Sequence, residues 1–168
     1  GLVNLRTFST PAPFLDCVGP TLLAREAESS LLLGIALRLA DGHSYGDEAP
    51  FLACVEEIGH CPVVALRTPP FNLTLCGDAG RLDALSLVAD HLAHAGCSLP
   101  GVHGRVDLTD SFARLWQART GAVPRVFQAQ RLYRLTEVAT SAGAVGRPRW
   151  AESEDAAVLA TWVEAFRT

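Results

Sequence analysis

A short turn between an apolar stretch and a long amphipathic stretch is the part of this sequence best suited to binding an anion. It reads CGDAGR and spans residues 76–81. The free backbone N–H groups at the start of a helix can hold a phosphate group. The candidate cofactor-binding residues are therefore Gly77, Asp78, Ala79, Gly80 and Arg81.

The two charged side chains of this turn have opposite effects on an anion. Asp78 brings a carboxylate into the candidate site, and a like charge at about 4–6 Å opposes phosphate binding even in a high dielectric. Arg81 could partly compensate by pairing with the phosphate. Two interpretations stay open at this point, a phosphate-binding turn and an ordinary connection between a strand and a helix.

Other reactive side chains also allow a functional and a structural interpretation. Glu56 and Glu57 could act as a general base for an amine substrate, or they could be solvated residues at the end of a hairpin. Cys54, Cys61 and Cys76 fall in predicted strands, where cysteine usually behaves as a small buried hydrophobic residue. We expect no cysteine nucleophile.

A possible metal site lies near the end of the predicted helix 81–95. His91, His94 and Cys97 follow one another at a spacing of about one helical turn, and imidazole and thiolate groups bind Zn²⁺. A structural zinc site needs four ligands, however, and the next candidate, His103, is separated by a Pro-Gly turn. We therefore expect no metal in this chain.

Composition limits the class of protein. The chain has 168 residues, 49% of them hydrophobic, and a net charge of −4, so it suits one domain with a small appendage and not a nucleic-acid partner. Five irregularly spaced cysteines without a CxxC pair favour a reducing compartment. The longest apolar run, 31–39, is too short to span a bilayer, and no signal-peptide pattern is present. We expect a cytoplasmic protein without membrane contact.

Hydrophobic periodicity predicts a mixed α/β fold in which helices flank a largely antiparallel central sheet. The expected strands cover residues 2–8, 50–57, 61–70, 71–76, a short stretch around Val102, and 122–138. The expected helices cover 11–18, 20–40, 81–95 and 108–120. Gly19-Pro20 is expected to separate the first two helices. In the second, the expected buried side chains are Leu23, Ala27, Leu31, Ile35 and Leu39.

The C-terminal region has a different pattern. Residues 139–148 are small and lack periodicity, which predicts a linker, and Ser153 is the expected N-cap of a further helix. That helix carries an apolar stripe formed by Leu159, Trp162, Val163 and Phe166. Because such a stripe buries apolar surface at about 25 cal/mol per Å², we expect it to dock on its own domain, on another subunit, or on a further part of the protein.

The order of these elements resembles the GNAT (GCN5-related) acyltransferase superfamily over residues 2–138. The segments FLDCVGPTLLAREAESSLLLGIALRL, ALRTPPFNL and RLYRLTEV look like the N-terminal half of bacterial proteins that carry two GNAT-like domains in tandem. RPRWAESEDAAVLATWVEAF is similar to the start of a second such domain. The expected organisation is a GNAT-like domain at 1–138, a linker at 139–148, and the truncated start of a second domain at 149–168.

The resemblance implies acetyl-CoA as cosubstrate, a primary amine as acceptor, and pyrophosphate binding by the 77–81 turn. Gly77 and Ala79 match the family turn, whereas Thr74 replaces its Gln or Arg. The predicted helix 108–120 lacks the tyrosine that GNAT enzymes often use as general acid. We therefore expect a degenerate GNAT half that depends on a second GNAT domain or forms a homodimer. The alternative is a non-catalytic dimerisation module that exposes the 159–166 stripe.

Overall fold

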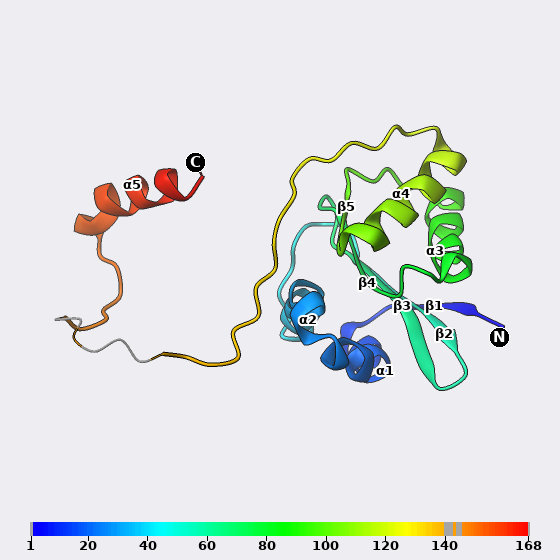
Figure 1. Ribbon diagram of the computed structural model, residues 1–168, viewed down its shortest axis with the longest axis horizontal. Helices are drawn as coiled ribbons and strands as arrows, with labels where there is room; N and C mark the ends of the chain where they lie inside the picture. The colour runs from blue at the N-terminus through cyan, green and yellow to red at the C-terminus, as the bar shows by residue number, and fades with distance from the viewer. Residues whose placement is uncertain (1, 140–142, 144–145, 168) are drawn as a thin grey trace. The chain divides into compact units, whose positions relative to one another are not determined.

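The computed structural model describes residues 2–139, 143 and 146–167, and the chain divides into two units. The first unit covers residues 1–134 and the second covers residues 135–168; each is described by itself below (Figure 1). Half of the linker expected at 139–148, residues 140–142 and 144–145, lies outside the described residues.

The first unit is built on a five-stranded open sheet. Its strands are β1 (Asn4–Phe8), β2 (Phe51–Glu57), β3 (His60–Arg67), β4 (Leu73–Gly77) and β5 (Val102–His103). They lie in the order β1-β2-β3-β4-β5, with antiparallel pairing from β1 to β4 and parallel pairing between β4 and β5. The mixed α/β class and the largely antiparallel sheet are thus confirmed, as is the hairpin between β2 and β3.

Helices cover both faces of this sheet and create two hydrophobic cores (Figure 1). The helices are α1 (Pro11–Ala24), α2 (Glu26–Ala40), α3 (Leu82–His94) and α4 (Val106–Thr120). Side chains alternate between the two faces of a strand, so Cys54 and Val64 face α1 and α2, whereas Val55 and Val63 face α3 and α4. A sheet covered on both sides explains why β3 and β4 are apolar almost throughout.

The sequence predicted that the first helix ends before Pro20, but the structure shows a longer helix. α1 continues through Pro20, and the break falls at Arg25, whose φ and ψ of −123° and 35° are not helical. Packing explains the difference, because the helix places a row of fully buried side chains at four-residue intervals. These are Phe14, Val18 and Leu22. Ending the helix at Pro20 would remove the last of them from the core.

The buried face of α2 also differs from the expected one. Its buried residues are Ser29, Leu32 and Ala36, while Leu23 and Leu31 are 62% and 47% exposed. Because the break lies at Arg25, Leu23 belongs to α1 and cannot share a face with α2. The hydroxyl of Ser29 donates to the carbonyl of Leu22 at 2.7 Å, which satisfies the end of α1 and allows a polar residue in the core.

The helices on the other face are close to the expected ones. Helical spacing predicts one buried face for the helix expected at 81–95, formed by Leu82, Leu85, Val88, Ala89 and Leu92; all of them except Leu82, which is 51% exposed, are buried in α3. α4 begins two residues earlier than expected, with Arg105 in the N-cap position. The carboxylate of Asp107 pairs with Arg105 at 2.6 Å, so Asp107 lies inside the first helical turn instead of capping it.

The strand predicted at 122–138 is not formed. Residues 121–139 have no regular secondary structure and are exposed. Alternating apolar residues favour a strand only where a neighbouring strand pairs with its N–H and C=O groups, and β5, with two residues, is the short edge next to β4. The large exposed apolar side chains of the segment are Val123, Val126, Phe127, Leu132, Tyr133, Leu135 and Val138.

In the second unit, the described residues form a 3₁₀ turn, Ser153–Asp155, followed by α5 (Ala156–Arg167). The N-cap is Glu152 and not Ser153, because Glu152 and Asp155 form a reciprocal capping box. Trp162 and Val163 on α5 are 64% and 53% exposed. Among the helices of the described residues, none has the length and apolar character that crossing a membrane requires.

Candidate functional site

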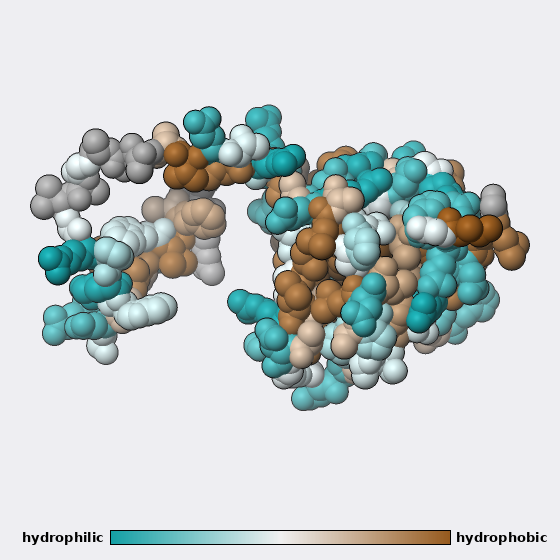
Figure 2. Space-filling view, turned by 90° about the horizontal axis from the view of Figure 1, so that it is seen from below, coloured by the Kyte–Doolittle hydropathy of each residue, from teal (hydrophilic) through white to brown (hydrophobic). Residues whose placement is uncertain are grey.

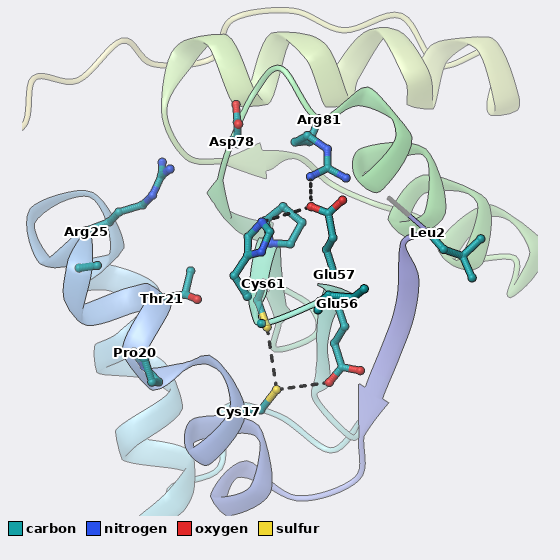
Figure 3. Close-up of a pocket in the computed structure, with 15 residues that line it drawn as sticks. Leu2, Cys17, Pro20, Thr21, Arg25, Glu56, Glu57, Cys61, Asp78 and Arg81 are labelled. Atoms are coloured by element: carbon teal, nitrogen blue, oxygen red, sulfur yellow. Dashed lines mark hydrogen bonds and ion pairs between the residues drawn. The ribbon is translucent and has the colours of Figure 1, made fainter.

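An open pocket of about 940 Å³ lies in the first unit between α1, the β2–β3 hairpin and the turn that follows β4 (Figure 3). Two of the five predicted cofactor-binding residues, Asp78 and Arg81, line it. Glu56 and Glu57, the alternative general bases, lie on the hairpin side of the same pocket. The fold therefore brings together the two groups of residues that the sequence suggested for chemistry.

Gly77 occupies a backbone conformation that the turn requires. Its φ is +146°, and a Cβ added there would lie 2.2 Å from the carbonyl oxygen of Pro62 on the neighbouring strand. The carbonyl of Gly77 accepts a hydrogen bond from the Arg25 guanidinium at 3.0 Å. Glycine is thus needed at position 77, because only a residue without a Cβ lets the end of β4 pack this closely against β3. Its carbonyl also binds Arg25, the residue between α1 and α2.

The backbone N–H groups of the turn already donate within the protein. The amide of Asp78 donates to the carbonyl of Pro62 at 2.9 Å, and that of Arg81 donates to the carbonyl of Asp78 at 3.2 Å. The amide of Gly80 donates to the carboxylate of Asp78 at 2.9 Å. Asp78 thus supplies the negative charge that a bound phosphate would supply. Ala79 packs at the edge of the core under α3 and α4.

Arg81 is held by two carboxylates. Its guanidinium donates to Glu57 at 2.6 Å and to both oxygens of Asp83 at 3.0 and 2.9 Å. These hydrogen bonds lower the pKa of Asp83 to about 2, lower the pKa of Glu57, and raise the pKa of Arg81. To bind a phosphate, Arg81 would have to give up this bidentate pairing.

Glu56 is also engaged. Its Oε1 accepts a hydrogen bond from Arg6 on β1 at 2.9 Å and lies 3.6 Å from the Sγ of Cys17. The hydrogen bond from Arg6 lowers the pKa of Glu56, as Arg81 does for Glu57. A general base for an amine works best with a pKa near the operating pH, so both carboxylates are shifted away from that role.

Beside the pocket lies a group that sequence reasoning missed, the three-thiol group of Cys17, Cys54 and Cys61, of which Cys17 and Cys61 line the pocket and Cys54 is fully buried. The Sγ of Cys17 lies 3.8 Å from that of Cys54 and 3.9 Å from that of Cys61. Burial raises the pKa of the Cys54 and Cys61 thiols. The three residues are far apart in the chain, and only the packing of α1 on the hairpin brings them together.

The remaining candidates are placed elsewhere in the described part of the chain. His91 stacks on Phe51 with ring centroids 5.6 Å apart, and the Nδ1 of His94 lies 2.7 Å from the carbonyl oxygen of Asp90. Tyr45 contacts His43 in the loop before β2, and Tyr133 is exposed. Among the described residues, His91, His94 and Cys97 do not bring their ligand atoms together in a group that could hold one metal ion, whereas the three thiols of Cys17, Cys54 and Cys61 lie within 4.8 Å of one another.

The chain matches no family model, no curated protein and no solved structure. The fold and the site define a mixed α/β domain with an open sheet, two helical layers and a pocket at the end of β4. The GNAT resemblance of the sequence stays a prediction beside this class.

Proposed function

We propose that this chain is a GNAT-like domain that serves in assembly and does not itself bind acetyl-CoA. Acetyl transfer to a primary amine would then take place on an associated catalytic GNAT domain. The observation that carries this proposal is the closed state of the 77–81 turn, in which the amides of Asp78, Gly80 and Arg81 and the Arg81 guanidinium already have protein partners.

The charge of the pocket supports the same proposal. Three carboxylates, those of Glu56, Glu57 and Asp78, line it together with the guanidinium groups of Arg25 and Arg81. Coenzyme A carries several phosphate charges, and phosphate binding requires an excess of donors and cations at the site. An excess of carboxylates repels such a ligand, because like charges at contact distances oppose binding even in high dielectric.

We expect calorimetric titration of the chain with acetyl-CoA to give no binding heat at millimolar ligand. Asp78→Ala removes the internal carboxylate and frees the Gly80 amide, so we expect binding in the millimolar range, about −4 kcal/mol, in this variant alone. Asp110→Ala, at an exposed position of α4, is the matched control. Micromolar binding by the unaltered chain would refute the proposal that the turn is closed.

Exposed apolar side chains support the assembly role. Figure 2 shows hydrophobic residues alternating with hydrophilic ones along the extended segment after α4. On α5 the aromatic side chains of Trp162 and Phe166 are also exposed, and the described residues of their own unit form no second layer that covers them. A second copy of the chain presents the same surfaces, so symmetric pairing could cover both sets at once. We propose this second copy as the partner.

The expected result in analytical ultracentrifugation is a mass that rises from monomer to dimer with concentration. Because aromatic residues often dominate interface energy, Trp162→Ser should weaken dimerisation roughly tenfold or more. Trp150→Ser is the matched control, since Trp150 is 93% exposed and lies outside α5. A monomer at every concentration, or equal loss in both variants, would contradict the proposed partner.

A further inference from the structure

The three-thiol group connects three elements that are separate in the chain. Cys17 lies on α1, Cys54 on the core face of β2, and Cys61 near the start of β3, just after the hairpin turn. Cys54 and Cys61 are buried, while Cys17 is half-buried and lines the open pocket together with Cys61. A small solute can therefore reach Cys17 and Cys61 through the pocket.

The spacing of the sulfur atoms fits a single metal ion. With a Zn–S distance of about 2.3 Å, tetrahedral geometry requires sulfur atoms about 3.8 Å apart. Two of the three pairs lie at 3.8 and 3.9 Å, and all three sulfur atoms fall within 4.8 Å of one another. Little movement of the side chains would be needed to give each sulfur a bond to one ion.

Glu56 can supply the fourth ligand once its side chain turns further toward the thiols, because its Oε1 lies near Cys17 but is not among the ligand atoms that lie within 4.8 Å of one another. It lies two residues after Cys54 on β2, where the register with β3 shifts between Val55 and Glu57. With Zn–S and Zn–O bonds of about 2.3 and 2.0 Å, a tetrahedral site places sulfur and oxygen about 3.5 Å apart, and Oε1 lies 3.6 Å from the Sγ of Cys17. Arg6 donates to the same oxygen, as outer-sphere partners of metal-binding carboxylates do.

We propose that Cys17, Cys54, Cys61 and Glu56 form a structural zinc site that fastens α1 to the β2–β3 hairpin; Figure 3 shows Cys17, Cys61 and Glu56 of this site. Zinc binding replaces the three thiol protons, which pass to solvent, with three Zn–S bonds. The carboxylates of the pocket, which oppose an anionic ligand, attract a cation on its way to the site. The site is independent of the assembly role proposed above, because neither α5 nor the 77–81 turn contributes a ligand.

The test is titration of the reduced, metal-free chain with Zn²⁺, with Co²⁺ as a spectroscopic probe of tetrahedral thiolate ligation. We expect one ion per chain and a thermal midpoint that rises with Zn²⁺. Cys17→Ala should weaken binding roughly 100-fold or more, since it removes a ligand. Cys97→Ala is the matched control, because Cys97 is also half-buried and lies outside the three-thiol group. Glu56→Gln should weaken binding roughly tenfold.

A second measurement on the unaltered chain keeps the test independent of variant folding. Zn²⁺ should protect cysteines 17, 54 and 61 from alkylation, as mapped by mass spectrometry, and leave Cys97 reactive. Absence of binding and of protection would overturn the site, as would equal loss of affinity in the Cys17→Ala and Cys97→Ala variants. Unchanged affinity in Glu56→Gln would overturn the four-ligand arrangement. The zinc site would also be contradicted if peroxide converted the reduced thiols to a disulfide at a rate that Zn²⁺ does not change.

Discussion

Replacing Gly77 by alanine is expected to lower the free energy of unfolding of the first unit by about 4 kcal/mol. Two costs add. A residue with a Cβ is strained by roughly 1–3 kcal/mol in a sparsely populated region of positive φ, and φ is +146° here. The new Cβ would also lie 2.2 Å from the Pro62 carbonyl oxygen and 2.9 Å from the Val63 Cα. Because both atoms belong to the backbone of β3, no side chain can rotate to make room.

Gly19→Ala is the matched control for this substitution. Gly19 lies inside α1, and no atom outside the neighbouring residues and the helix's own nearby backbone comes within 4 Å of an added Cβ. Alanine in a helix is favoured over glycine by about 0.5–1 kcal/mol, so this variant should be as stable as the original chain or more so. Urea unfolding followed by circular dichroism measures both. A loss below about 1 kcal/mol for Gly77→Ala would contradict the strained geometry of the turn.

Phe14→Ala is expected to cost about 4 kcal/mol of unfolding free energy, in the range found for buried phenylalanine. Phe14 is fully buried between α1 and the sheet. Its ring packs edge-to-face against Phe8 at the end of β1, with centroids 5.5 Å apart. The substitution removes this aromatic contact and leaves a cavity in the core that supports Cys17 and α1.

The control for the core substitution is Phe127→Ala. Phe127 is 92% exposed in the segment that follows α4, so at protein concentrations where the chain is monomeric its removal should change stability by at most about 0.5 kcal/mol. Guanidinium unfolding monitored at several wavelengths compares the two variants, with the slope of the transition as a check on the two-state assumption. Equal midpoints for both variants would show that Phe14 does not support the core as its burial indicates.

Elements whose pattern is local and whose neighbours are close in the chain were predictable. The β2–β3 hairpin followed from two apolar runs around Gly59, and α3 followed from helical spacing of Leu85, Val88 and Leu92. The extent of α1 was not predictable, because Pro20 is a strong local signal for the end of a helix, and the core packing that overrides it depends on the tertiary structure. The same holds for residues 122–138, which form no strand. Alternation of apolar and polar residues does not indicate whether a neighbouring strand is available to pair with them.

The candidate site was predicted only in part. The turn at Gly77–Arg81 was identified as a strand-to-helix connection, and the sign of Asp78 indicated the conflict with an anion. In the structure the Asp78 carboxylate accepts a hydrogen bond from the Gly80 amide, and Glu57 pairs with Arg81. Both contacts depend on side-chain positions that the spacing of residues in the sequence does not predict. The three-thiol group was missed because α1 and the hairpin are separated by α2 and a loop in the chain.

The spatial order of the strands is the same as their order along the chain, and this bears on how the protein is made. Each strand from β2 onward pairs with one that the ribosome has already released. The core beneath α1 and α2 uses buried residues between Phe8 and Cys76, while the core beneath α3 and α4 extends to Phe112. Folding during synthesis proceeds from the N-terminus. The core beneath α1 and α2 can therefore form while the residues of α4, which complete the core on the other face, are still being translated.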